Sequence, residues 1–250
     1  FNVAYLGFVS SNTEVGYYSS SVKLFNILLS FYTAFTGVLL PRMSYLVSNG
    51  DNESFSNLLI LSFKILFLIA FPIIIISEVY APEIISIMSG SEFDGAIVPM
   101  RIVMPLVLII GLEQIFVFQI LMPKNKDREV FINSIVGALV GIIANFLVVS
   151  KLGASGSSLV WLISETCVLI ISFCFAYTAI IKVPIFSLFL RRFIYSIPIS
   201  LIMIFIKIMW PGIISLCISC LVLVCYYFII EVYVDKDSPI RIILLNYYKR

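Results

Sequence analysis

Histidine is absent from the 250 residues. The chain therefore lacks the side chain that most often serves as a general base, a metal ligand or a switch near neutral pH. Its five cysteines all lie in apolar runs: Cys167, Cys174, Cys217, Cys220 and Cys225. Cys217 and Cys220 have the C-x-x-C spacing, but a zinc or redox site needs polar surroundings and further ligands. We interpret all five as small apolar helix residues and expect no metal and no cofactor.

Charge is also scarce. Charged residues make up 12% of the chain, against about 25% in soluble domains. Hydrophobic residues make up 61%, and the mean hydropathy is +1.12. This composition leaves too little polar surface to cover a globule in water, so lipid or other helices must surround most side chains. The net charge of +2, without a basic run that interleaves aromatic residues, argues against nucleic acid as a partner.

The apolar residues fall into runs that are long enough to cross a bilayer, which takes about 20 residues. Residues 1–9 read as the end of one span, and because the chain opens inside an apolar run without Met, we expect it to be the C-terminal part of a longer protein. Seven complete spans are predicted at 17–40, 57–81, 96–122, 129–150, 156–181, 191–210 and 212–234. The alternating pattern of an outer-membrane barrel is missing from the sequence. The predicted fold class is an all-α, polytopic transmembrane helical bundle.

Lysine and arginine are distributed unequally between the two sides of this bundle. Taken alternately, one set of linkers holds 11 of these residues and the other holds 3, counting those at span edges. The larger set consists of Arg42, Lys124, Lys126, Arg128, Lys182, Arg191, Arg192, Lys236, Arg241, Lys249 and Arg250. The positive-inside rule places this set, and with it the C-terminus, in the cytoplasm.

Polar residues inside the spans are the candidate functional residues, because a charge in hydrocarbon costs several kcal/mol and usually faces a cavity or a partner. Glu165 lies about 15 Å into its span, and Glu113 lies past the middle of 96–122. Lys23 lies about 10 Å below the predicted outer surface. Asn145 adds an amide, and Arg101 lies near the outer end of its span.

Each of these residues also has an ordinary structural interpretation. Arg101 and Lys64 can reach the headgroups along their own alkyl stems, whereas the two glutamates are too short to do so. A buried ion pair of Lys23 with Glu165 or Glu113 is a further alternative. The spacing Gly137-x-x-x-Gly141 predicts a close approach between two helices.

Four segments, taken in order, resemble the C-terminal half of the polysaccharide transporter family, the O-antigen flippases. They are YLG followed by NTEVGYYSSSVKLFNIL, then LLPRMS, then ILMPKNKDREVFINSIVGALVGIIANFLVV, and then KLGASGSSLVWLISE. The first contains an E-V-G-x-Y element, Glu14 to Tyr17 or Tyr18, that runs into a helix with Lys23. The resemblance covers 1–181, residues 182–234 look like an additional pair of transmembrane helices, and 235–250 would be a cytoplasmic tail.

The resemblance implies the second of two pseudo-symmetric bundles, which face each other across a cleft that opens alternately to either side of the membrane. The implied substrate is an undecaprenyl-diphosphate-linked oligosaccharide, which would be moved to the periplasmic leaflet of the bacterial inner membrane. The polysaccharide polymerase machinery is a further implied partner. A cationic Lys23 would lower the cost of bringing the diphosphate across. Glu113 and Glu165 would carry a proton or hold that lysine in place.

Two other classes of function are open to the same pattern. A multidrug-type, cation-coupled exporter shares the two-bundle architecture, but drug substrates favour a cavity lined by acids over one lined by lysine. A membrane enzyme, such as an acyltransferase or an oligosaccharide polymerase, would be expected to show a histidine or a large outward loop with arginines. We therefore expect a transporter and no enzyme. Since the sequence shows no ATP-binding loop, an ion gradient or downhill substrate flow would drive it.

The distribution of charge generates a direct prediction about topology. A reporter enzyme fused after Arg250 should be active on the cytoplasmic side, because the basic linkers lie on that side. Paired alkaline phosphatase and fluorescent-protein fusions measure this. A periplasmic signal from the fusion after Arg250 would overturn the count of seven complete spans.

Overall fold

The computed structural model describes residues 2–181, 183–235, 238 and 241, and every regular element in that part is a helix. The principal helices are α1 (Asn2–Val9), α2 (Asn12–Ser48), α3 (Asn52–Ser89), α4 (Ile97–Val103), α5 (Leu106–Gln114), α6 (Asp127–Ile180), α7 (Ile185–Met209) and α8 (Ile213–Ile229). Three short segments complete the described elements: the 3-10 helix η1 (Ser91–Ala96) and the π-helices η2 (Ile115–Leu121) and η3 (Ile230–Val234). The predicted tail, 235–250, lies outside the described residues except for Asp235, Ser238 and Arg241.

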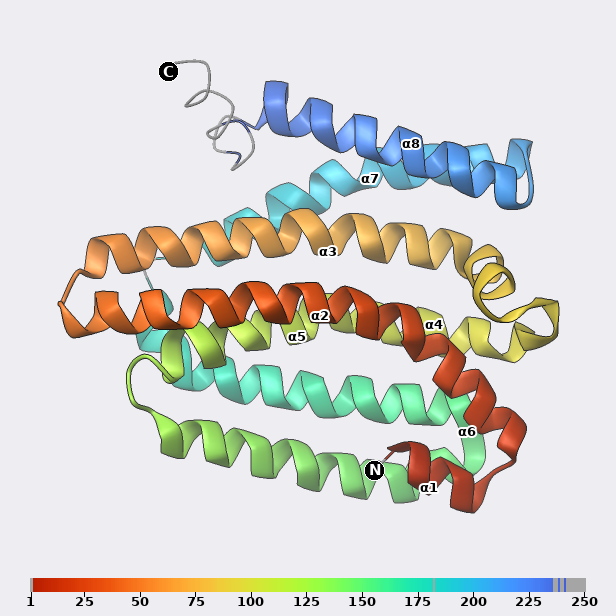
Figure 1. Ribbon diagram of the computed structural model, residues 1–250, viewed down its shortest axis with the longest axis horizontal. Helices are drawn as coiled ribbons and strands as arrows, with labels where there is room; N and C mark the ends of the chain where they lie inside the picture. The colour runs from red at the N-terminus through yellow and green to blue at the C-terminus, as the bar shows by residue number, and fades with distance from the viewer. Residues whose placement is uncertain (1, 182, 236–237, 239–240, 242–250) are drawn as a thin grey trace.

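The chain is a multi-pass membrane protein. Six helical stretches in the described part are long and apolar enough to cross a membrane. One of them, α6, has 54 residues, which is about 80 Å at 1.5 Å per residue, whereas the hydrocarbon core is about 30 Å thick. Gly153, at φ 53° and ψ −128°, breaks α6 into two antiparallel halves (Figure 1). Counted as two crossings, these halves bring the total to the seven that the hydropathy pattern predicts, and the all-α bundle is confirmed.

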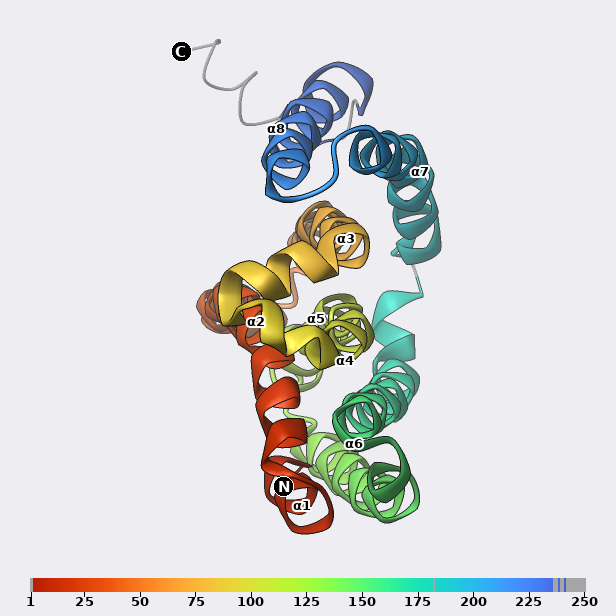
Figure 2. The same ribbon diagram turned by 90° about the vertical axis from the view of Figure 1, so that its right-hand side faces the viewer.

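The helices lie side by side along the long axis of the molecule (Figure 1). Viewed end-on, α2, α3 and α5 lie between two helix pairs, the halves of α6 on one side and α7 with α8 on the other (Figure 2). α6 packs against α4, α5 and η2, whereas α7 and α8 pack against α3. The largest core cluster is rich in phenylalanine and includes Phe25, Phe63, Phe67 and Phe116, all buried.

Several helix boundaries differ from those predicted, and proline explains two of the differences. The predicted linker 81–95 is largely helical, because α3 continues to Ser89. Pro82 has no N–H to donate to the carbonyl four residues earlier, so α3 bends at Tyr80, at φ −110° and ψ 22°, and does not end there. The predicted span 96–122 is likewise interrupted before Pro105, between α4 and α5.

The third difference concerns α7, which begins at Ile185 and not at residue 191. Arg191 and Arg192 therefore lie inside the helix and not in a linker. Arg192 is 2% exposed and pairs with Glu231 and with Asp235, the latter at 3.0 Å from Nη2 to Oδ2. Arg191 Nη1 lies 3.3 Å from Asp235 Oδ1. Two arginines and two acids thus neutralise one another where α7 meets the end of α8.

The turn before α2 and the turn inside α6 are joined by one carboxylate. Ser11 caps α2 by accepting from the N–H of Glu14 (3.3 Å). Glu14 Oε2 in turn accepts from the N–H of Ala154 (2.6 Å), one of the free donors at the start of the returning half of α6. A Cβ at Gly153 would collide with the Glu14 carboxylate. The glutamate of the E-V-G element and the glycine of the predicted turn are therefore partners in one contact.

This contact predicts that Gly153→Ala destabilises the protein. Alanine would be strained at this backbone conformation and would also displace Glu14, so we expect a loss of about 1–3 kcal/mol. The midpoint of thermal unfolding in detergent, followed by size-exclusion chromatography, measures the loss. In a Glu14→Ala background the collision disappears, so Gly153→Ala should cost less there.

Gly37→Ala is the matched control. Gly37 also lies in a long helix, but an added Cβ would meet no atom within 4 Å, so alanine should be neutral or slightly stabilising. Equal losses from Gly153→Ala with and without Glu14 would show that the two residues do not act together.

Candidate functional site

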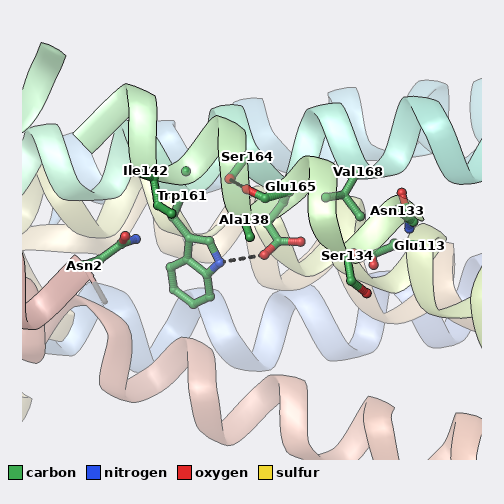
Figure 3. A pocket seen from close by; sticks show the side chains of 12 residues that line it. Asn2, Glu113, Asn133, Ser134, Ala138, Ile142, Trp161, Ser164, Glu165 and Val168 are labelled. Atoms are coloured by element: carbon green, nitrogen blue, oxygen red, sulfur yellow. Dashed lines mark hydrogen bonds between the residues drawn. The ribbon is translucent and has the colours of Figure 1, made fainter. Parts of the chain in front are cut away.

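A cavity of about 470 Å³ lies between α5, the start of α1 and the two halves of α6. Its polar wall combines carboxyl, amide, hydroxyl and indole groups (Figure 3). The residues that line it are Asn2, Glu113, Asn133, Ser134, Gly137, Ala138, Gly141, Ile142, Trp161, Ser164, Glu165 and Val168. The sequence predicted two of these, Glu113 and Glu165, as site residues, and the fold brings them together although 52 positions separate them in the chain.

Glu165 is held by its neighbour one turn away. Trp161 Nε1 donates to Glu165 Oε1 (3.0 Å), as drawn in Figure 3. The indole ring itself is fixed by an edge-on contact with Phe25 of α2, with 4.9 Å between the ring centres. Glu113 lines the same cavity from α5. The cavity therefore contains two acids, and one of them, Glu165, accepts a hydrogen bond from a neutral donor.

Small residues allow the two halves of α6 to approach each other and shape the cavity floor. Ser164 Oγ donates to the carbonyl of Gly137 across the hairpin (2.8 Å). A Cβ at Gly141 would come within 2.9 Å of Ser164 Oγ, and one at Gly137 would collide with Val168. The Gly137-x-x-x-Gly141 spacing thus does what the sequence predicts, because side chains at either position would push the hairpin apart.

Gln114 sets the rotation of α5 about its axis. The sequence analysis did not identify this residue. This residue is 8% exposed, and its amide bridges to α2. Its Nε2 donates to Thr33 Oγ1 (2.9 Å), and its Oε1 accepts from Thr36 Oγ1 (3.0 Å). Because consecutive side chains on a helix point about 100° apart, anchoring Gln114 on α2 leaves Glu113 directed at α6. The available signal was the i, i+3 pair of threonines in an apolar helix.

Asn145 belongs to the support of the cavity. It is 0% exposed, and its Nδ2 donates to Asn2 Oδ1 (2.8 Å) and to the carbonyl of Gly141 (2.7 Å). Asn2, and not Asn145, is the amide that lines the space. The role of Asn145 is therefore to hold α1 against α6 at the edge of the cavity.

Lys23 and Arg101 lie elsewhere. Both are exposed, and neither lines the cavity. Among the described residues, no ion pair joins Lys23 to Glu113 or Glu165, so the buried pair considered from the sequence is not formed here. The Arg101 guanidinium is close enough to Glu78 of α3 for a Coulombic interaction. Of the five predicted residues, Glu113 and Glu165 thus line the cavity, Asn145 supports its edge, and Lys23 and Arg101 lie exposed elsewhere.

Lys23 is part of a polar stripe on α2, defined as Ser19, Lys23, Asn26, Ser30 and Thr33. The spacings of four, three, four and three residues place all five on one face of the helix. The last four are exposed, and Ser19 is half-buried. The stripe runs beside the buried face that contains Tyr18, Phe25 and Tyr32. A row of amide, hydroxyl and ammonium groups on an exposed face of a membrane helix needs water or protein beside it.

Comparison with known proteins connects the first part of the chain to polysaccharides. A family model described as "Polysaccharide biosynthesis protein" matches residues 3–98, which is less than half of the chain. The matched region contains Glu14 and the whole polar stripe, whereas Glu113 and Glu165 lie beyond it. No curated protein matches the chain. The match supports a role in the synthesis or transport of polysaccharide.

The Gln114 contacts predict that Gln114→Met lowers the free energy of unfolding by about 1 kcal/mol. Two hydrogen bonds between helices would be lost, and such bonds contribute about 0.6 kcal/mol each on average in membranes. Thermal unfolding in detergent measures the change.

Gln119 provides a matched control five residues further on. It is 0% exposed, and neither of its amide atoms has a hydrogen-bond partner within the described part of the chain. Gln119→Met removes a buried amide that makes no such bond, so it should be neutral or stabilising. Equal destabilisation by both substitutions would contradict the role assigned to Gln114.

Proposed function

We propose that this chain forms one helix bundle of a flippase that moves undecaprenyl-diphosphate-linked polysaccharide repeat units from the cytoplasmic to the periplasmic leaflet of the bacterial inner membrane. The family match to polysaccharide biosynthesis supports the class of substrate. The multi-pass helical architecture supports a transporter. In this proposal the C-terminus is cytoplasmic, and the protein acts without catalysis.

The observation that carries the proposal is the polar stripe on α2. α2 is long and apolar enough to cross the membrane, yet Lys23, Asn26 and Ser30 are exposed on one of its faces. A lysine in the centre of a bilayer costs roughly 2.5–3.5 kcal/mol by insertion measurements. That cost disappears if the stripe lines a water-filled cleft between this bundle and a second one. A hydrophilic sugar chain needs such a surface of hydroxyl and amide groups along its path.

Lys23 has the charge that the diphosphate requires. The substrate is anionic at its phosphate groups, and an ammonium group in a cleft of low dielectric attracts it more strongly than the same group in water. Lys23 lies one turn beyond Ser19 and one turn before Asn26, so neighbouring groups can bind the adjoining sugar. Arg101 is exposed as well, in the last turn of α4 and near the outer end of its predicted span, and it would attract the same anion as the substrate leaves.

A multidrug-type, cation-coupled exporter remains the alternative of the same architecture. Its hydrophobic cations favour acids in the cleft, whereas the exposed stripe of α2 contains a lysine and no acid. The two acids, Glu113 and Glu165, are half-buried and line the cavity between α5 and α6, away from that stripe. Together with the family match, this arrangement favours the lipid-linked oligosaccharide.

The proposal predicts that Lys23→Ala abolishes surface polysaccharide and leaves the protein in the membrane. The positive charge that offsets the diphosphate would be lost, while the bundle, which does not bury Lys23, would be kept. Gel analysis of cell-surface polysaccharide in a strain without the chromosomal gene measures function, and a fluorescent fusion measures the amount of protein.

Lys23→Arg should restore most of the polysaccharide, since it keeps the charge. Lys151→Ala is the matched control, because Lys151 is also an exposed lysine, but it lies at the turn of α6 away from the stripe. Wild-type polysaccharide in the Lys23→Ala strain would remove Lys23 from the mechanism.

A further inference from the structure

The cavity between α5 and α6 offers an occupant mainly hydrogen-bond acceptors, because its own donors are already used. The two serines that line it donate to backbone carbonyls within α6, Ser134 at 3.1 Å and Ser164 at 2.8 Å. The indole N–H of Trp161 is donated to Glu165 (3.0 Å). The groups that remain for a ligand are mostly oxygens with free lone pairs, so the occupant must bring hydrogen-bond donors.

Asn133 gives a second, independent indication that this cavity binds a donor. It lines the same space and is 2% exposed. Its Nδ2 donates to Ser172 Oγ (2.8 Å), whereas its Oδ1 has no hydrogen-bond partner among the described residues. A buried carbonyl oxygen without a partner destabilises the fold, and a donor in the cavity removes that cost.

The size and the opening of the cavity fit an organic molecule. Its volume of about 470 Å³ far exceeds the roughly 30 Å³ that one water molecule takes in the liquid, and it falls in the range of roughly 300–1,000 Å³ of pockets that bind organic ligands. Ser134 and Ala138 are exposed members of the lining, so the cavity opens at the surface of the described chain. A ligand can therefore enter it from outside the bundle.

The walls combine apolar surface with acceptors, and a sugar ring has the complementary groups. The Trp161 ring extends from the returning half of α6 (Figure 3), and Ile142 and Val168 add apolar surface. A sugar presents C–H groups on the faces of its ring and hydroxyl groups around the rim. The C–H face can pack on the indole while the hydroxyl groups donate to carboxyl and amide oxygens.

A hydroxyl group suits the two acids better than an ammonium group does. A hydroxyl donates and also accepts, so it satisfies Glu113 and Glu165 whether or not either acid is protonated, whereas an ammonium group only donates. Recognition by hydroxyl groups therefore needs no charge on the ligand.

The cavity adjoins the polar stripe of α2 at one turn of α5. Gln114 Nε2 donates to Oγ1 of Thr33, the last residue of the stripe (2.9 Å), and the preceding residue, Glu113, lines the cavity. Consecutive residues of α5 thus contact the stripe and the cavity.

We propose that this cavity binds one neutral sugar residue of the repeat unit, with the sugar ring packed on Trp161 and its hydroxyl groups donated to Asn133, Glu113 and Glu165. The origin of the sugar in a repeat unit rests on the proposed function. The proposal deepens that function by dividing recognition between two sites. Lys23 on the stripe binds the diphosphate, and the cavity selects the sugar by the pattern of its hydroxyl groups.

Trp161 reports on the site through its fluorescence. The chain has two tryptophans, so Trp210→Phe leaves Trp161 as the one emitter. The full chain in nanodiscs is titrated with glucose, galactose, mannose and N-acetylglucosamine, and in parallel with glycerol and methylammonium chloride. At least one of the four sugars should change the emission along a saturating curve, whereas glycerol and methylammonium should not.

Ala138→Phe tests whether the sugar lies in the cavity. Because Ala138 lines it, the larger ring should fill the space and weaken the apparent affinity by about tenfold or more. Leu139→Phe is the matched control, since Leu139 is the next residue and is exposed but does not line the cavity, and it should bind as wild type. If Ala138→Phe misfolds, the titration of the Trp210→Phe protein still decides whether a sugar binds.

Four results would overturn the proposal: no saturating response to any of the four sugars, an equal response to glycerol, saturation by methylammonium, or an unchanged affinity in folded Ala138→Phe. The titration involves no transport. A saturating sugar response together with wild-type polysaccharide in the Lys23→Ala strain would therefore count against the flippase mechanism alone. The opposite pair of results would count against the sugar site alone.

Discussion

Hydrocarbon offers no hydrogen bonds, and most of the polar contacts in this bundle follow from that constraint. Tyr80, 0% exposed at the bend of α3, pairs with Ser219 Oγ (2.6 Å) and donates to the carbonyl of Met203 (3.3 Å). Lys207 donates to the carbonyl of Val79 (2.7 Å) and to Glu83 (2.8 Å) at the same bend. At this bend, Lys207 of α7 thus bonds to a backbone carbonyl, and residues of α7 and α8 satisfy the Tyr80 hydroxyl. α7 and α8 therefore contact α3 at its bend.

The same constraint made the architecture predictable. Because a crossing must be both long and apolar, hydropathy alone located seven crossings and the all-α class. Boundaries were less predictable, since a helix can continue past the apolar run if its polar groups find partners. Arg192 shows this, because its acids, Glu231 and Asp235, come from another helix. Nothing in the local sequence around Arg192 distinguishes a charge buried by distant partners from one in a loop.

The sequence predicted which types of residue form the candidate site, but it did not predict which of them lie together. Glu113 and Glu165 stood out because short acids cannot reach the headgroups, and the structure places them in the lining of one cavity. Lys23 stood out as a charge within a predicted span, but it lies on the exposed face of α2. Which helix faces which neighbour depends on contacts such as that of Gln114 with Thr33 and Thr36, which no pattern of hydropathy encodes. Whether these residues act in transport stays a prediction.

The hydrogen bond from Ala154 to Glu14 joins residues 140 positions apart in the chain, so its two partners are synthesised at different times. At about 5–20 residues per second, a ribosome needs roughly 7–30 s to make the second partner after the first. By the end of that interval α2, α3 and α5 have all been synthesised, while the carboxylate of Glu14 still lacks the donor that it will later accept from. The bundle therefore closes late in synthesis, when the turn of α6 arrives, and a chain that stalls before Gly153 would remain an open set of helices.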